Sequence, residues 1–229
     1  MIKIGLYNMS LWNDYLTHNG RNAGKWSHYF NAYERHFSTW KDKSVTFLEI
    51  GTAQGGSLQM WRGFFGPKAK IISIDIMPQC QELQIPGTFV RIGDQSDPKF
   101  LQSLVDEFGI PDIILDDGGH TMAQQIVTLE CGFPHLNDGG VIIIEDTHTS
   151  YYDSHGGNSE RTFMNYAKTL LDIPQHQFYQ KPSPTPELVE RYKDIYSVNI
   201  YNSMVILEKK KFEAMKDLNS KQSFFEYKA

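Results

Sequence analysis

The sequence predicts an α/β domain: a mostly parallel sheet, doubly wound, with helices on both faces. Short apolar runs rich in β-branched residues recur along the chain, which is typical of strands buried on both faces. Stretches of helical length and period separate these runs, and such alternation predicts a parallel sheet. Two further runs towards the end of the chain are joined by a two-residue turn, which predicts an antiparallel hairpin.

The expected elements follow in chain order. We expect five parallel strands, at residues 45–50, 70–74, 88–92, 113–115 and 141–144. Helices are expected between them, at residues 57–65, 97–108 and 121–133. The C-terminal antiparallel hairpin is expected from residues 194–201 and 204–208, with Asn202 and Ser203 in its turn. Together these runs predict a sheet of seven strands.

The two ends of the chain are less regular. Residues 1–40 are rich in Trp, Tyr and His, and we expect them to form an N-terminal helical cap on the edge of the sheet or over its mouth. Residues 41–229 are expected to form the main domain, in one structural unit with the cap. Three prolines within residues 181–186 predict a stiff loop, because proline cannot donate a backbone hydrogen bond. The tail after Lys211 is expected to be helical and peripheral.

The composition narrows the range of partners. The formal net charge is -5, so the chain has no basic surplus with which to neutralise a nucleic acid. No apolar run approaches the ~18 residues that a membrane helix needs, and the first residues lack the pattern of a signal peptide. The two cysteines, Cys80 and Cys131, are far apart and have no metal-like spacing. We therefore expect a cytoplasmic protein that binds neither nucleic acid nor membrane, and a homo-oligomer is left open.

A glycine-rich turn follows the first expected strand. In Glu49-Ile-Gly51-Thr-Ala-Gln-Gly55-Gly-Ser57, the glycines allow a tight turn and the close approach of a ligand, and Ser57 can cap the next helix. Asp75 ends the second strand, where a carboxylate can accept both hydroxyls of a ribose. The spacing differs from G-x-G-x-x-G, and Glu49 would repel a pyrophosphate but suit the cationic methionine end of S-adenosylmethionine. A plain turn with a capping acid is the alternative.

These stretches resemble the motifs of class I S-adenosylmethionine-dependent methyltransferases. Glu49-x-Gly51-x-x-x-Gly55 with Asp75 resembles the first two motifs, and Gly93-Asp94-Gln95-Ser96 resembles the third, whose acid and neighbour meet the adenine. The resemblance implies an S-adenosylmethionine site formed by Glu49, Gly51, Gly55, Ser57, Asp75, Asp94 and Gln95. Asp94 could equally cap the helix that is expected from Asp97.

Acidic residues end the fourth and fifth expected strands. The fourth strand runs into Leu115-Asp-Asp-Gly-Gly-His120 and the fifth into Glu145-Asp146, so these side chains should meet at the carboxyl edge of the sheet. Successive strand side chains point to opposite faces, so Asp116 and Asp117 diverge unless the glycine pair turns the chain. Like charges this close repel strongly unless a cation intervenes, and oxygen ligands favour Mg²⁺, Mn²⁺ or Ca²⁺.

This arrangement resembles the metal-dependent macrolide-sugar O-methyltransferases of the mycinamicin type and their cephalosporin-biosynthesis relatives. Their pattern is D-D-G-S-H and, after a strand, I-E-D; the stretches from Asp116 to His120 and from Ile144 to Asp146 match it, with Gly119 in place of the serine. The resemblance implies that Asp117, Glu145 and Asp146 bind Mg²⁺ or Mn²⁺ and that His120 is the general base. Asp116 is then a structural or cofactor-contacting acid.

The early stretch KWSHYFNAYE, residues 25–34, resembles the N-terminal segment that closes over the cofactor in that group. The resemblance implies a cofactor contact for Tyr29. Plainer interpretations stay open for two residues of the acidic stretches: His120 could cap a helix that begins at Thr121, and Asp146 could bond a neighbouring threonine.

The sequence thus predicts an S-adenosylmethionine-dependent, divalent-metal-dependent O-methyltransferase. Its acceptor would be a small molecule, a glycoside or saccharide or another vicinal diol, and a catechol fits a chelated diol as well. Two other classes compete with this prediction. A nicotinamide-dependent oxidoreductase is disfavoured by the glycine spacing and by the absence of an evident Tyr-x-x-x-Lys pair. A non-catalytic S-adenosylmethionine-binding module would keep the cofactor pocket without methyl transfer.

Overall fold

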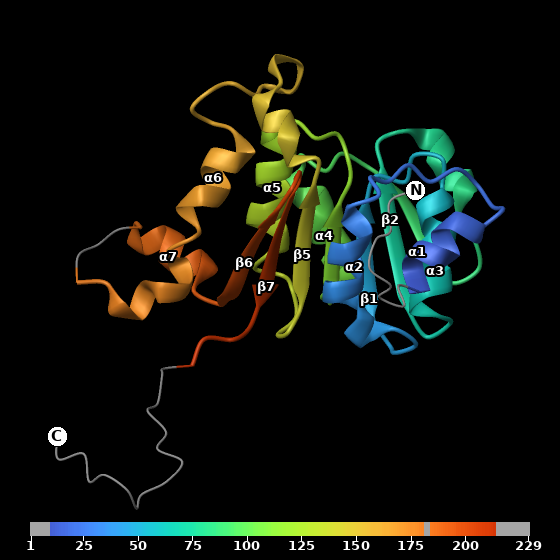
Figure 1. Ribbon diagram of the computed structural model, residues 1–229, viewed down its shortest axis with the longest axis horizontal. Helices are drawn as coiled ribbons and strands as arrows, with labels where there is room; N and C mark the ends of the chain where they lie inside the picture. The colour runs from blue at the N-terminus through green and yellow to red at the C-terminus, as the bar shows by residue number, and fades with distance from the viewer. Residues whose placement is uncertain (1–9, 181–183, 214–229) are drawn as a thin grey trace, which may run out of the picture.

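The computed structural model describes residues 10–180 and 184–213, and the expected tail after Lys211 lies almost wholly outside this range. A seven-stranded sheet runs through the molecule in the order β3-β2-β1-β4-β5-β7-β6 (Figure 1). Its strands are β1 (Thr46–Ile50), β2 (Lys70–Asp75), β3 (Thr88–Ile92), β4 (Ile113–Asp116), β5 (Val141–Glu145), β6 (Ile195–Tyr201) and β7 (Met204–Lys209). The predicted seven-stranded, doubly wound sheet is confirmed.

The order of the strands in the sheet reverses at β1, and this reversal marks where on the sheet a ligand is expected to bind. β2 and β3 lie on one side of β1 while β4 and β5 lie on the other, and all four pairings among these strands are parallel. In open α/β sheets, ligands bind beyond the carboxyl ends of the strands at such a switch point. Ile50 pairs with Asp116 and Asp116 with Ile144, so β1, β4 and β5 end level with one another.

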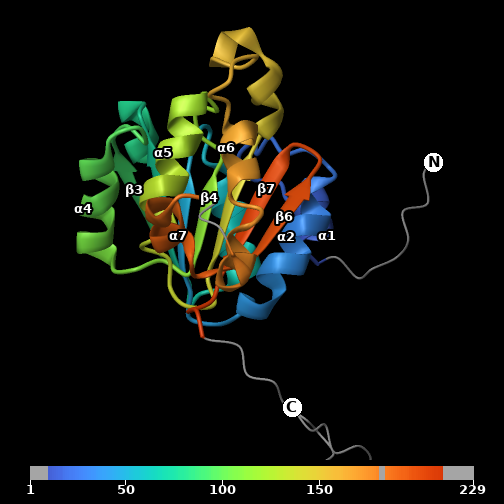
Figure 2. The same cartoon turned by 90° about the vertical axis from the view of Figure 1, so that its left-hand side faces the viewer.

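Two helical layers cover the sheet, one on each face (Figures 1 and 2). The first layer comprises α1 (Ser10–Thr17), α2 (Tyr29–Phe37) and α3 (Gly56–Phe65). The second comprises α4 (Pro98–Phe108), α5 (Met122–Gly132), α6 (Phe163–Thr169) and α7 (Pro186–Tyr192). Short 3-10 helices span Ser38–Trp40, Pro78–Leu83, Thr147–Tyr151, Asp153–His155 and Ile173–Phe178. No helix in the described ranges is long and apolar enough to cross a bilayer.

The N-terminal helices belong to the main hydrophobic core. Phe30, Tyr33 and Phe37 of α2 are fully buried in the same cluster as Phe47 of β1 and Trp61 of α3. Burial of each such ring stabilises the fold by about 1.5–3 kcal/mol. The helical part of the expected cap therefore covers a face of the sheet and not its edge. The loop before α2, and not a helix, reaches the carboxyl ends of β4 and β5, where Lys25 contacts Asp117 and Glu145.

The C-terminal half contains the predicted hairpin and helices that the sequence did not predict. β7 pairs antiparallel with both β5 and β6, and Ser203 in the turn has a φ of 61°. The prediction of a loop over the proline-rich stretch is wrong at its end, because Pro186 begins α7 and Thr185 caps it. Proline is well tolerated in a first turn, where its missing N–H would have had no helical partner.

Candidate active site

The turn after β1 packs against the turn after β4. Gly51 has a φ of 99°, and a Cβ there would lie 2.1 Å from the carbonyl oxygen of Asp117. Only glycine fits this approach without strain. The Asp75 carboxylate at the end of β2 accepts the backbone N–H groups of Thr52 (3.0 Å) and Ala53 (2.9 Å), which holds the turn in place.

A cavity of about 200 Å³ opens beside this turn. It is lined by Ile50, Gly51, Ala53, Ile74, Asp75, Ile76, Gly93, Asp94, Gln95, Asp117, Gly118, Gly119 and Gln124. Four of the predicted cofactor residues therefore share one cavity: Gly51, Asp75, Asp94 and Gln95. The alternative that Asp94 caps α4 is wrong, since Asp97 is the cap and Asp94 accepts hydrogen bonds from Ser96.

Three other predicted cofactor residues are buried and do not line this cavity. Glu49 is completely buried and accepts hydrogen bonds from Ser57 Oγ (2.9 Å) and Trp61 Nε1 (2.9 Å). Gly55, with a φ of 74°, occupies the cap position of α3 that was expected for Ser57. That part of the prediction is wrong, because the Ser57 hydroxyl is engaged by Glu49. Direct contacts of Glu49, Gly55 and Ser57 with a cofactor stay predictions.

Burial raises the pKa of Glu49 to about 7, although Lys25, Trp61 and Ser57 oppose the shift. The folded state therefore holds a proton that the unfolded chain releases near pH 4.5, and raising the pH towards 7 costs folding free energy. Between pH 4.5 and pH 7, the free energy of unfolding of the wild type should therefore fall by roughly 3 kcal/mol relative to that of Glu49→Gln. Urea unfolding at several pH values measures the difference, with Glu187→Gln at an exposed position as control. A pH-independent difference would contradict the assignment.

Asp116 and Asp117 have different surroundings and different roles. Asp116 is buried and accepts hydrogen bonds from Gln95 Nε2 (3.0 Å) and from the backbone N–H of Gly118 (3.1 Å). The side-chain oxygen Oε1 of Gln95 accepts a hydrogen bond from the backbone N–H of Gly119 (2.8 Å). Asp116 and Gln95 thus shape the glycine pair, and the interpretation of Asp116 as a structural acid is supported. A Cβ at Gly119 would lie 2.3 Å from the Gln124 side chain, so a serine there would require that side chain to move.

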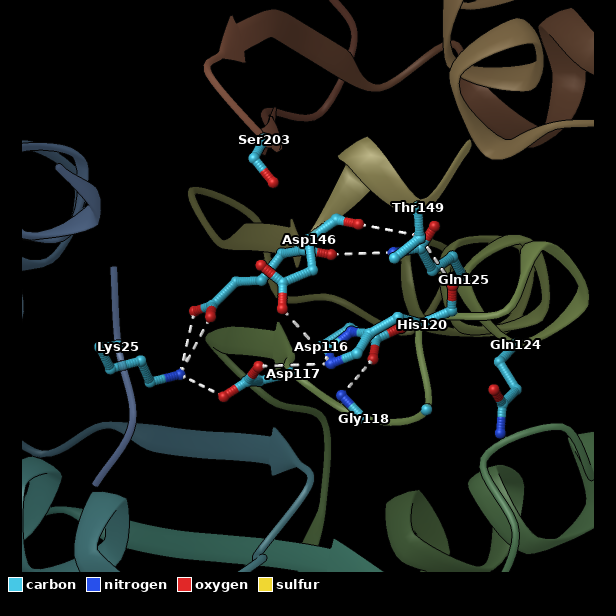
Figure 3. Close-up of polar contacts among 12 residues, drawn as sticks. Lys25, Asp116, Asp117, Gly118, His120, Gln124, Gln125, Asp146, Thr149 and Ser203 are labelled. Carbon is cyan, nitrogen blue, oxygen red and sulfur yellow. Dashed lines mark hydrogen bonds and ion pairs between the residues drawn. The ribbon is translucent and has the colours of Figure 1, made fainter. Parts of the chain in front are cut away.

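Asp117 and Asp146 come together with His120 at the tips of β4 and β5 (Figure 3). One ligand atom from each of these three residues lies within 4.8 Å of the other two. His120 Nε2 is 3.5 Å from Asp146 Oδ2 and 3.9 Å from Asp117 Oδ1. His120 and Asp146 also have left-handed backbones, with φ values of 55° and 53°. Such strain, on the order of 1–3 kcal/mol per residue, is concentrated at functional sites in proteins.

The plainer interpretation of His120 is wrong, and that of Asp146 holds only for its backbone carbonyl. Thr121 caps α5 and forms a capping box with Gln124, so His120 is not the cap. The side chain of Asp146 accepts a hydrogen bond from Tyr29 Oη (2.7 Å), whereas Thr149 bonds the backbone carbonyl of Asp146. Tyr29 therefore contacts the acidic cluster, and its predicted contact with a cofactor stays a prediction.

Lys25 is the residue of the site that sequence reasoning missed. Its ammonium lies 2.6 Å from Asp117 Oδ2 and 3.0 Å from Glu145 Oε2, and its side chain is only 2 % exposed. Tyr33 donates a further hydrogen bond to Glu145 Oε1. Burial alone would lower the pKa of Lys25, but the two carboxylates raise it above its ordinary value, so Lys25 is charged. The expectation that a metal ion alone offsets the acids is therefore incomplete. Lys25 precedes α2, so no helical spacing links it to the site, and the available signal was its place in the stretch of residues 25–34 that resembles the segment closing over the cofactor.

A second cavity, of about 270 Å³, lies directly over the acids. It is lined by Gly24, Lys25, Trp26, Tyr29, Asp117, Glu145 and Asp146. Asp117 lines this cavity and also the one beside the glycine turn. A ligand in one cavity can therefore approach a ligand in the other at Asp117.

The residues present suit a divalent cation. Asp117 and Asp146 offer carboxylate oxygens, the ligands that Mg²⁺ and Mn²⁺ prefer, and His120 Nε2 lies beside them. Glu145 lies on the adjacent strand tip, but both of its oxygens accept hydrogen bonds from Lys25. Metal binding by Asp117, Glu145 and Asp146 is compatible with this geometry and stays a prediction.

The sheet order, the cavity at the switch point and the acid after β2 define the fold of class I S-adenosylmethionine-dependent methyltransferases. Within that class, the chain is homologous to the sugar O-methyltransferases of macrolide and tetracenomycin biosynthesis, of the mycinamicin type. No protein-family model matches the chain.

Three comparisons carry this assignment. The chain is 33% identical over 196 residues to mycinamicin VI 2''-O-methyltransferase of Micromonospora griseorubida, covering 80% of this chain and 48% of that protein. It is 32% identical over 192 residues to 8-demethyl-8-alpha-L-rhamnosyl tetracenomycin-C 2'-O-methyltransferase of Streptomyces olivaceus, covering 80% and 50%. The crystallised mycinamycin-pathway methyltransferase MycE, in complex with Mg, SAH and mycinamycin VI, superimposes with a TM-score of 0.75 at 29% identity, covering 88% and 53%. The chain thus spans about half the length of the relatives it matches.

Proposed function

We propose that this chain transfers a methyl group from S-adenosylmethionine to a hydroxyl of a sugar or another vicinal diol, with a divalent cation at the acidic cluster. The observation that carries the proposal is the position of Asp117, which lines both the cavity beside the glycine turn and the cavity over the acids. A donor in the first cavity and an acceptor in the second would meet there. The sugar O-methyltransferases among the relatives support a glycosylated small molecule as the acceptor class.

In the proposed donor site, residues of this chain bind S-adenosylmethionine and orient it. Asp75 and Asp94 line the cavity beside Gly51, at the place where a ribose and an adenine are expected. The backbone of the turn approaches the ligand closely because Gly51 has no side chain. Holding donor and acceptor in line is worth several kcal/mol of the barrier.

In the proposed acceptor site, Asp117 and Asp146, with Glu145 if Lys25 moves, would hold the cation. A bound Mg²⁺ would supply Lewis-acid stabilisation of negative charge on the acceptor hydroxyl. His120 takes the hydroxyl proton, because its Nε2 faces both aspartates and they stabilise the imidazolium that forms. His120 Nδ1 has no hydrogen-bond partner among the described residues, so no side chain fixes the tautomer.

An exposed aromatic ring lines the cavity over the acids and fits a sugar acceptor. Trp26 lines that cavity and is 56% exposed. The His148 ring lies 6.4 Å from the Trp26 ring and 5.2 Å from the Tyr152 ring, centroid to centroid, so His148 neighbours both rings. Exposed aromatic faces of this kind suit the apolar face of a pyranose.

Trp26→Ala is expected to raise KM for a glycoside acceptor roughly three- to tenfold and to leave kcat almost unchanged, because a ring contact contributes about 0.5–1.5 kcal/mol. Steady-state kinetics measure both constants. Tyr196→Ala, which removes an exposed ring from β6, is the control and should leave KM unaltered. Equal KM values for the wild type and Trp26→Ala would remove Trp26 from the acceptor site.

The proposed function is tested by incubating the chain with S-adenosylmethionine, Mg²⁺ and glycosides that carry vicinal hydroxyls, with catechol as a comparison acceptor. Mass spectrometry should detect a methylated glycoside, and EDTA should prevent its formation. Thermal shift assays with S-adenosylhomocysteine and with NAD test the alternatives. Stabilisation by NAD alone would indicate an oxidoreductase, and stabilisation by S-adenosylhomocysteine without transfer to any diol would indicate a binding module.

The cellular location is part of the proposal. Both cysteines are free thiols, Cys80 buried and Cys131 partly buried, and unpaired cysteines suit a reducing compartment. We therefore place the reaction in the cytoplasm. Localisation of a fluorescently tagged chain tests this placement.

A further inference from the structure

Lys25 supplies a positive charge inside the acidic cluster. Its ammonium contacts Asp117 Oδ2 at 2.6 Å and both oxygens of Glu145, at 3.0 and 3.2 Å (Figure 3). Glu145 is itself 1% exposed, and Tyr33 donates to the oxygen that Lys25 also contacts. A buried carboxylate without a partner is costly, so Lys25 and Tyr33 make this arrangement of Glu145 stable when no other cation is bound.

The two oxygens of Asp117 face different groups. Oδ2 contacts the Lys25 ammonium, whereas Oδ1 lies towards His120, on the side where Asp117, His120 and Asp146 gather. A divalent cation held by Asp117 Oδ1 and Asp146 would therefore be a near neighbour of the ammonium. Two positive charges this close repel each other, and the repulsion is weakly screened at a site with so little solvent.

Lys25 has a route by which to move. It lines the cavity of about 270 Å³ over the acids, and its four-carbon stem is flexible. The chain just before it is anchored elsewhere: the backbone N–H of Arg21 donates to Gln59 Oε1 (2.7 Å), and the side-chain Nδ2 of Asn22 donates to Gln54 Oε1 (2.9 Å). The ammonium can thus leave Glu145 without release of the anchored backbone.

We propose that Lys25 is an internal counter-cation that competes with the divalent cation for the acidic cluster. With no divalent cation bound, the ammonium holds Asp117 and Glu145 together; when the cation binds, it displaces the ammonium from Glu145. This role of Lys25 rests on the proposed function in one respect only, the binding of a divalent cation at these acids.

Calorimetric titration with Mn²⁺, without donor or acceptor, tests the competition. Lys25→Met is expected to bind Mn²⁺ about tenfold more tightly than the wild type, within the range of couplings between neighbouring groups in one network. Lys43→Met removes an exposed positive charge elsewhere and should change the affinity by less than about twofold. If the competition acts through Glu145, Lys25→Met should no longer increase the Mn²⁺ affinity when Glu145 is also replaced by glutamine. A gain of the same size in the Glu145→Gln variant would overturn the role of Glu145.

The melting temperature gives an independent readout. Lys25→Met should melt below the wild type without Mn²⁺, and saturating Mn²⁺ should raise its melting temperature more than that of the wild type. Lys25→Gln, which keeps a hydrogen-bond donor, replaces Lys25→Met if the latter does not fold. Mn²⁺ affinity in both variants equal to or weaker than in the wild type would overturn the inference, even if the wild type transfers methyl groups. A wild type that binds Mn²⁺ in this way but transfers no methyl group would instead refute the proposed function.

Discussion

Replacing His120 with alanine is expected to lower kcat for methyl transfer by about two to four orders of magnitude, the usual contribution of a general base. S-Adenosylhomocysteine affinity should change less than about twofold, because His120 does not line the cavity beside the glycine turn. His120 Nε2 faces Asp117 and Asp146, so its loss removes the group that takes the proton and leaves the carboxylates in place. Single-turnover kinetics and calorimetry measure the two quantities.

Two companion variants sharpen this test. His120→Asn keeps a residue type that tolerates a φ of 55°, and therefore separates loss of the base from strain in the turn. His148→Ala removes the other imidazole near the acids, which lies 3.9 Å from Asp146 Oδ1. Unchanged turnover in His120→Ala together with a large loss in His148→Ala would assign the base to His148.

Asp117→Asn is expected to weaken Mg²⁺ or Mn²⁺ binding by at least about tenfold and to lower turnover at limiting metal in proportion. Asp117 offers Oδ1 to the cation side of the cluster, and an amide is a poorer ligand for a hard cation than a carboxylate. Turnover measured against metal concentration gives the apparent affinity. In EDTA, both the wild type and the variant should be inactive.

The control for this substitution is Asp153→Asn, which makes the same chemical change at an exposed position in the loop after β5. Its metal requirement should match that of the wild type. Activity of Asp117→Asn in EDTA, or a metal requirement identical to that of the control, would show that Asp117 is not a metal ligand.

The parallel half of the fold was predictable from the sequence because its strands are buried on both faces. The runs at β1 to β5 have apolar centres, and each strand lies within one residue of its expected place. The helices α6 and α7 were not predictable in the same way. They are only seven residues long, and a proline at the start of α7 suggests a loop unless the capping Thr185 is weighed with it.

Within the site, the sequence predicted the residues that stand at or directly after the ends of strands. Asp117, Glu145 and Asp146 follow directly from strand termination, and the structure brings them to one edge. Sequence reasoning did not find Lys25. The partners of Lys25 are Asp117 and Glu145, which lie 92 and 120 positions further along the chain, so these contacts depend on how the N-terminal segment crosses the sheet. The hydrogen bonds of Glu49 with a buried hydroxyl and an indole also become visible only in three dimensions, and its contact with a cofactor stays a prediction.

The left-handed backbone at His120 and Asp146 restricts how this site can be redesigned. Asparagine, aspartate, histidine and glycine are the residues that tolerate such a conformation best, whereas valine, isoleucine and threonine are strongly disfavoured there. A library that randomises both positions and is screened only for folded protein should therefore be enriched in those few residue types. Engineering for a new acceptor would gain more from Trp26 and Tyr152, whose exposed side chains carry no such backbone restriction.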